Sequence, residues 1–166
     1  MRISVFESEE LQATVLALRG FDRALQAQVR AQTKRIGQPE WQSELRSRAS
    51  TRLESRVLAD TGRVKVSNQN VTLTSASVGR ALSGGGRPAE LWGAVEFGTA
   101  PRKVRVRGTS TRGKPYSYTR TVGTGFRPRR PAGYVVHPAA KAMIPRFASL
   151  WVQTTVRTFH EALEGR

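Results

Sequence analysis

The chain has 166 residues, the usual size of one domain, and its hydrophobic content of 38% excludes a fully disordered protein. It has no cysteine, which excludes a disulfide framework. It also has no apolar run that approaches the roughly 18 residues of a membrane span, and its start lacks the apolar core of a signal peptide. We therefore expect a soluble protein that is made in the cytosol. The formal net charge of +16 favours binding to a polyanion, an anionic membrane or an acidic protein surface, with a merely solvated basic surface as the alternative.

The N-terminal part is predicted to hold a short strand and two helices. Alternation of polar and apolar residues over 2–6 predicts the strand. Ser8 can then cap a long amphipathic helix, which Gly37-Gln38-Pro39 should end because proline disfavours helical geometry in the residue before it. The second helix is predicted from apolar residues at every fourth position, namely Trp41, Leu45, Ala49, Leu53 and Val57.

The middle of the chain is predicted to contain a hairpin, a loop and a buried strand. Residues 63–66 and 71–73 alternate on either side of an Asn68-Gln69-Asn70 turn, which predicts an antiparallel hairpin. Residues 83–88 are glycine-rich, but no Gly-Lys-Ser/Thr follows them, so a phosphate site is not favoured. The apolar run 91–97 is predicted to be a buried strand.

The basic charge gathers in the second half of the chain. Residues 97–160 contain 13 Lys and Arg and no Asp or Glu, which gives this segment +13 of the formal +16. Basic and apolar residues alternate from Pro101, break at 108–115, and alternate again to Val122. We predict a single domain over 1–166 in which 100–133 form a basic loop or hairpin arm, with an ordinary surface excursion as the alternative.

The basic segment is predicted to contact a partner protein or DNA. Tyr116, Tyr118 and Phe126 interleave with its cations, either as a stacking surface or as ordinary sheet packing. No helix-turn-helix or zinc signature is present, so sequence-specific readout is not expected. The residues predicted to make the electrostatic contact are Arg102, Lys103, Arg105, Arg107, Arg112, Lys114, Arg120, Arg127, Arg129 and Arg130.

The last part is predicted to be a short strand, 134–136, followed by a helix from His137-Pro138 that kinks or properly starts at Pro145. This helix carries two apolar tracks, which together exceed what one packing surface needs. One track is Met143, Phe147, Leu150 and Trp151, and the other is Val152, Val156, Phe159 and Leu163. We predict that one side covers the sheet and that an oligomer interface involves Trp151, Val152, Val156, Phe159 and Leu163.

The sequence does not favour an enzyme, a metal site or a cofactor. His137 and His160 lie 23 residues apart without a local carboxylate cluster, which is not ligand spacing. Glu96 has no visible histidine or serine constellation around it. We therefore predict that its carboxylate bonds to the backbone or to an arginine.

The order of elements resembles a known family. The run Val95-Glu96-Phe97-Gly98-Thr99, followed by the basic excursion, Pro138-Ala139-Ala140 and a terminal helix, is similar to the small tail-component, or tail-completion, proteins of long-tailed bacteriophages over most of the chain. Family members usually have a compact loop where this chain has the expanded segment 100–133. The resemblance implies a virion protein of the neck, made in the host cytoplasm and assembled as a ring, with six-fold symmetry expected, around the DNA channel between head and tail.

From residues and resemblance together we expect a head–tail joining protein whose arm contacts an acidic neighbouring ring or the packaged DNA. Its expected partners are neighbouring neck and tail proteins, and no binding to a membrane is expected. A non-specific double-stranded DNA-binding protein is the alternative, and tail-completion, terminator and stopper rings all stay open. Phe97 is expected to fill the core and Gly98 to adopt a backbone conformation closed to other residues. The expected fold is α+β: a small antiparallel sheet packed by a long N-terminal helix, a second helix and a long C-terminal helix, with an extended basic hairpin arm.

Overall fold

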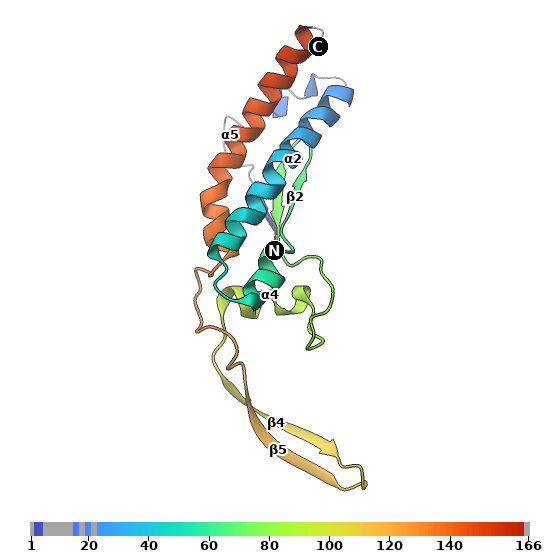
Figure 1. The fold of residues 1–166 in the computed structure, drawn as a ribbon, viewed down its shortest axis with the longest axis vertical. Helices are drawn as coiled ribbons and strands as arrows, with labels where there is room; N and C mark the ends of the chain where they lie inside the picture. The colour runs from blue at the N-terminus through green and yellow to red at the C-terminus, as the bar shows by residue number, and fades with distance from the viewer. Residues whose placement is uncertain (1, 5–14, 17–18, 21–22, 165–166) are drawn as a thin grey trace.

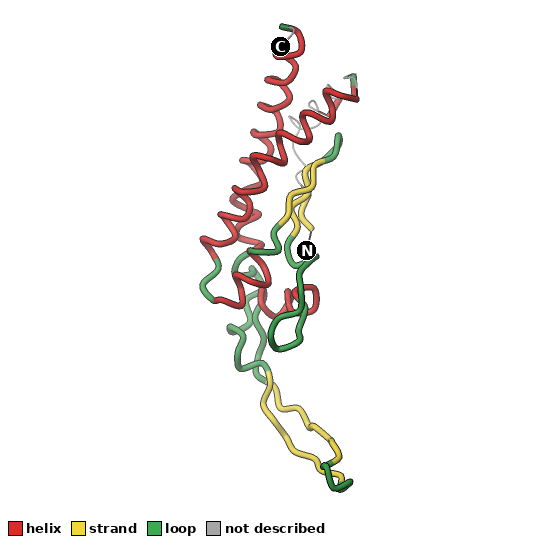
Figure 2. The backbone as a smooth tube through the Cα atoms, turned by 45° about the vertical axis from the view of Figure 1, so that its right-hand side comes forward, coloured by secondary structure: helices red, strands yellow, loops and turns green. Residues whose placement is uncertain are grey.

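The computed structural model describes residues 2–4, 15–16, 19–20 and 23–164, and it confirms the predicted α+β fold. Helices α2 (Arg23–Arg48) and α5 (Val136–Leu163) lie side by side along the body (Figure 1). A small sheet packs against α2, and a two-stranded hairpin projects from one end of the body, as Figure 2 also shows from a second direction.

The sheet in the body has three antiparallel strands in the order β1-β3-β2, formed by Arg2–Ser4, Val71–Thr74 and Arg63–Val66. The hairpin of β2 and β3 confirms the prediction from alternation, with Val66 opposite Val71. At its turn the backbone N–H of Ser67 donates to the carbonyl of Asn70 at 2.8 Å. β1 pairs with β3 and completes the sheet.

Helix α2 does not end where the sequence predicts. It runs through Gly37, Gln38 and Pro39 to Arg48, while the predicted start at Ser8 lies outside the described residues. These apparent stop residues make tertiary contacts instead. The Gln38 side chain accepts from the backbone N–H of Val64 at 2.8 Å and donates to the carbonyl of Gly62 at 2.9 Å, so it pairs with the edge of β2. These contacts, together with the packing of α2 on α5, offset the hydrogen bond that a proline removes from a helix.

The predicted second helix is divided. After α2 ends, Thr51 caps α3 (Arg52–Glu54), which continues into the π-helical turn η1 (Ser55–Ala59). Thr51 and Glu54 form a reciprocal capping box, in which each side chain accepts from the other residue's backbone N–H. The apolar residues at every fourth position still contribute to the interior, since Trp41, Leu45 and Val57 are fully buried.

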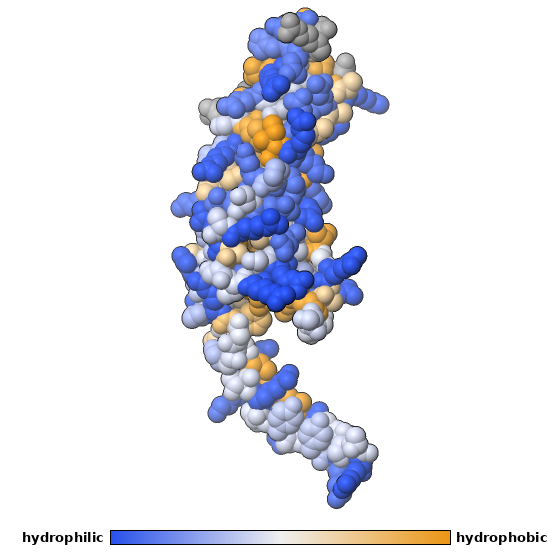
Figure 3. All heavy atoms as spheres, viewed as in Figure 1, coloured by the Kyte–Doolittle hydropathy of each residue, from blue (hydrophilic) through white to orange (hydrophobic). Residues whose placement is uncertain are grey.

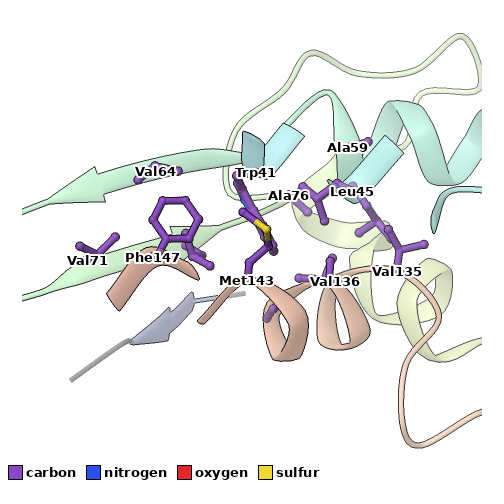
Figure 4. Packing of buried hydrophobic residues seen from close by; sticks show 14 of the residues in the cluster. Trp41, Leu45, Ala59, Val64, Val71, Ala76, Val135, Val136, Met143 and Phe147 are labelled. Carbon is purple, nitrogen blue, oxygen red and sulfur yellow. The ribbon is translucent and has the colours of Figure 1, made fainter. Parts of the chain in front are cut away.

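The core lies where α2, α5, η1 and the sheet meet (Figure 4). Trp41 is fully buried, and its indole Nε1 donates to the carbonyl of Thr74 at 3.1 Å, which ties α2 to β3. Met143, Phe147 and Trp151 of α5 are also buried there. One track of the final helix therefore packs inside the body, as predicted.

Two local predictions in the second half are wrong, and for Pro145 one of the two predicted alternatives is excluded. The run 91–97 belongs to helix α4 (Pro88–Phe97), where proline occupies the first turn and the Glu90 carboxylate accepts from the backbone N–H of Arg87 at 3.1 Å. Residues 134–136 are not a strand, because Val135 flanks the N-terminus of α5 and Val136 begins that helix. α5 then continues through Pro145, which is therefore not its start.

Candidate functional site, a basic arm and its anchor

The predicted arm is an antiparallel ribbon of β4 (Arg102–Thr109) and β5 (Pro115–Val122). Each strand has eight residues and is therefore about 25 Å long. The turn is closed by hydrogen bonds between Ser110 and Lys114 and by Gly113, whose φ of +75° suits glycine. The main contacts of β4 and β5 are with each other, so the ribbon leaves both faces open to a partner.

One face of the ribbon is cationic and hydroxylic. Lys103, Arg105 and Arg107 alternate along β4, and their cross-strand partners on β5 are, in the same order, Thr121, Thr119 and Ser117. Opposed residues share one face of an antiparallel pair, so these six side chains lie together. All six are exposed, and Arg105 Nη2 donates to Ser117 Oγ at 3.2 Å. We call this set the cationic face.

The opposite face is largely aliphatic and aromatic. Val104 and Val106 lie opposite Arg120 and Tyr118, and Gly108 lies opposite Tyr116. The two tyrosine rings stack with centroids 6.1 Å apart and an interplanar angle of 18°. With Arg102 and Val122 at its base, this set is the Val–Tyr face. Figure 3 shows hydrophilic and apolar side chains side by side along the projecting arm.

The ten predicted contact residues do not form one patch. Three lie on the cationic face, Arg102 and Arg120 lie on the Val–Tyr face, and Arg112 and Lys114 lie at the turn. The last three, Arg127, Arg129 and Arg130, lie beyond β5, where the chain returns to the body. The predicted contact residues therefore lie in four different places: the cationic face, the Val–Tyr face, the turn, and the segment that returns to the body.

Arg127 has partners within the chain. Its guanidinium lies 3.3 Å from Oε1 of Glu54, a carboxylate that is almost fully buried, and 3.7 Å above the ring of Tyr134. Arg130 lies over the same ring at 5.3 Å. Tyr134 in turn donates its hydroxyl to the carbonyl of Pro128 at 2.8 Å. These contacts fix the base of the arm to α3, so Arg127 has a structural role in addition to its charge.

Glu96 anchors the N-terminus of α5. It is fully buried, and its carboxylate accepts from the backbone N–H groups of Val135, Val136 and His137 at 3.1, 2.8 and 2.9 Å. These are donors that a helix start otherwise leaves unpaired, and the next residue, Pro138, has no N–H. The predicted bond between Glu96 and the backbone is confirmed.

Gly98 and Phe97 differ in how far their predicted roles hold. Gly98 has φ +67° and ψ 172°, a region essentially restricted to glycine, and a Cβ there would lie 2.7 Å from the carbonyl carbon of Pro128. Its predicted role is confirmed. Phe97 does not fill the core, because it is only half-buried, with its ring against Trp92 and His137 at centroid distances of 6.1 and 5.3 Å.

Three residues of this anchor, Glu54, Gly133 and Tyr134, were not predicted from the sequence. Glu54 could have been found from Thr51-Arg52-Leu53-Glu54, which has the spacing of a capping box. Gly133 has φ +71°, and a Cβ on it would lie 3.0 Å from Cδ of Glu96. Neither Gly133 nor Tyr134 carries a local signal, because each acts through contacts that only the fold creates.

The predicted oligomer interface on α5 divides between core and surface. Trp151 is fully buried in the protomer's own core, so it is not available to a second subunit. Val152 is half-buried, whereas Val156, Phe159 and Leu163 are 51%, 42% and 68% exposed. The outer track of α5 therefore carries the exposed part of the predicted interface.

Among the described residues, no group of three or more His, Asp or Glu is placed to hold a metal ion. None of the helices in that part of the chain combines the length and apolar character that crossing a membrane requires.

Comparisons of this chain with models of protein families, with curated proteins and with solved structures give no match.

Proposed function

We propose that the chain is a structural subunit of a phage neck, which assembles as a ring around the DNA channel and joins the head connector to the tail. The observation that carries the proposal is the arm, which this chain has in place of the compact loop usual in the family that it resembles, and which gives it an added contact surface. A ribbon about 25 Å long projects from a packed body and leaves both faces to a partner. Isolated two-stranded hairpins are at best marginally stable in water, so a partner surface is the natural setting for this one.

The anchor of the arm supports the same proposal. The resemblance to tail-completion proteins rests on the order of elements and on two segments, 95–99, expected to be a strand but found at the end of helix α4, and 138–140. The Glu96 carboxylate connects the first segment to the helix that contains the second. Gly98 packs on the segment by which the arm returns. The residues of the resemblance therefore hold the arm and the long helix α5 in a defined relation, which a subunit with a reaching arm requires.

A ring also needs two different surfaces on each subunit, because head-to-tail contacts close a cycle only when patch and partner patch differ. The arm is one such surface. The exposed outer track of α5, with Val156 and Leu163, is the other. We infer a homo-oligomeric ring with six subunits, in contact with neighbouring neck and tail proteins.

A second candidate function is non-specific binding of double-stranded DNA, and the cationic face of the arm favours it. The deciding experiment is electron microscopy of lysates from a phage that encodes this chain and carries an early stop codon in its gene, with the intact gene supplied in trans as the control. Filled heads lying apart from finished tails are the expected result. Normal, abundant virions without the protein would overturn the joining role in favour of the DNA-binding candidate.

A further inference from the structure

We propose that the arm has a single nucleic-acid surface: the cationic face, centred on Lys103, Arg105 and Arg107, binds the phosphate backbone of double-stranded DNA without reading its sequence. The Val–Tyr face turns away from the DNA. This inference deepens the proposed function and rests on it for the source of the DNA, which is the packaged genome.

The cationic face has the geometry of a linear array of charges. Its three cations form one row along β4, and Ser117, Thr119 and Thr121 form a parallel row of hydroxyls along β5. Alternate residues of a strand advance by about 6.7 Å, so the charges form a line rather than a cluster. A linear polyanion can place a negative charge beside each of the three cations in this row.

The charges of the cationic face have no acidic partner in the described part of the chain. Residues 97–160 contain no Asp or Glu, and none of the ion pairs within residues 2–4, 15–16, 19–20 and 23–164 involves β4 or β5. Arg127, by contrast, is held by Glu54 and Tyr134. The electrostatic attraction of the cationic face is therefore directed outward.

The side-chain composition of the cationic face favours DNA over an acidic protein as its partner. The six side chains that define the cationic face are Lys, Arg, Ser and Thr, which are common donors to phosphate oxygens, and the register adds the pair Thr109 and Pro115 at its outer end. Protein interfaces usually have an apolar, aromatic-rich centre surrounded by a polar rim. That composition belongs to the opposite face, with Val104, Val106, Tyr116 and Tyr118. The arm therefore presents phosphate-binding chemistry on one side and protein-binding chemistry on the other.

The test compares two variants that remove the same charge from opposite faces of the arm. R105S/R107S alters the cationic face, and R102S/R120S alters the Val–Tyr face. Binding of each purified protein to a duplex of about 30 base pairs is measured by fluorescence anisotropy between about 50 and 200 mM salt, and thermal melting checks that each variant is folded. Poly-glutamate serves as the probe for an acidic protein surface.

We expect R105S/R107S to weaken DNA binding by about tenfold or more and to lower the slope of log K against log salt by about 2, because two phosphate contacts are lost. R102S/R120S should change the slope by less than about 1. Equal losses in the two variants, no binding by the native protein at the lowest salt, or equally tight binding of poly-glutamate would each overturn the assignment. Because the assay uses isolated protein, failure of the neck role in lysates and failure of this assignment are distinguishable.

Discussion

The ring of Phe147 on α5 lies directly against the backbone of Gly37 on α2. A Cβ at Gly37 would overlap this ring and lie 2.9 Å from its Cζ, closer than side-chain packing allows. Phe147 is 1% exposed at this contact. The two long helices can therefore approach closely only because residue 37 has no side chain.

Replacing Gly37 with alanine should destabilise the protein even though alanine is the better helix former. The overlap with Phe147 is expected to cost about 1–3 kcal/mol or more, which exceeds the gain of about 1 kcal/mol in helix propensity. Gly93→Ala is the matched control, because Gly93 also lies in a helix but a Cβ there meets nothing within 4 Å. Urea unfolding should show a loss for G37A and no loss for G93A. Equal stability of the two variants would disprove the contact.

Removing the Glu96 carboxylate should destabilise the start of α5. Glu96→Ala leaves three backbone donors of a buried helix terminus without their acceptor, at an expected cost of about 2–4 kcal/mol. Glu90 offers a control, since its carboxylate accepts from the backbone N–H of Arg87 at an exposed helix start, and its replacement by alanine should cost about 0.5–1 kcal/mol. Denaturant unfolding gives both values, and a cost for E96A no larger than for E90A would contradict the anchoring role.

Gly98→Ala should be more damaging than alanine at another glycine with positive φ. Gly113 has φ +75° but meets nothing within 4 Å, so G113A measures only the backbone penalty of about 1–2 kcal/mol. Gly98 adds an overlap with the carbonyl groups of Arg127 and Pro128. We expect G98A to lower the melting temperature and the soluble yield well beyond G113A. Similar melting curves for the two variants would show that the close approach at Gly98 does not exist.

Deleting the end of the arm, residues 108–115, should leave the body folded. The main contacts of β4 and β5 are with each other, and no residue of either strand belongs to the hydrophobic core or packs on it. The truncated protein should therefore keep a cooperative thermal transition near that of the native chain. In a complementation assay the proposed function predicts that it fails to restore particle assembly, and a normal infectious yield would refute the proposed assembly role of the arm.

The alternating segments of the fold were predictable because their periodicity is local. The hairpin 63–74 and the arm both show the period of two that a strand with distinct faces requires. Segment 91–97 is too short and too uniformly apolar to separate a helix from a strand by period, and the capping at Arg87 and Pro88 decides for the helix. Gly37 and Pro39 resemble a helix stop in sequence, but packing on α5 overrides that preference.

The candidate site was predictable in charge but not in arrangement. Sequence identifies the basic segment, whereas the division into two faces needs the register that places Arg105 opposite Thr119 and Val106 opposite Tyr118. A structural hydrogen bond between Glu96 and the backbone was among the roles predicted from the sequence. Its partners lie about forty residues further along the chain, so no local pattern identifies them. The pairing of Arg127 with Glu54 spans a still longer separation.

Reconstruction of the neck of assembled virions by electron cryo-microscopy tests the proposed neck role most directly. The particles would come from a phage that encodes this chain, with mass spectrometry confirming that the protein is present in them. We predict a six-fold ring of this chain between head and tail, with each arm projecting from its subunit and its cationic face toward the DNA. Intact virions in which the protein is absent, or in which it lies away from the head–tail junction, would contradict the proposed function.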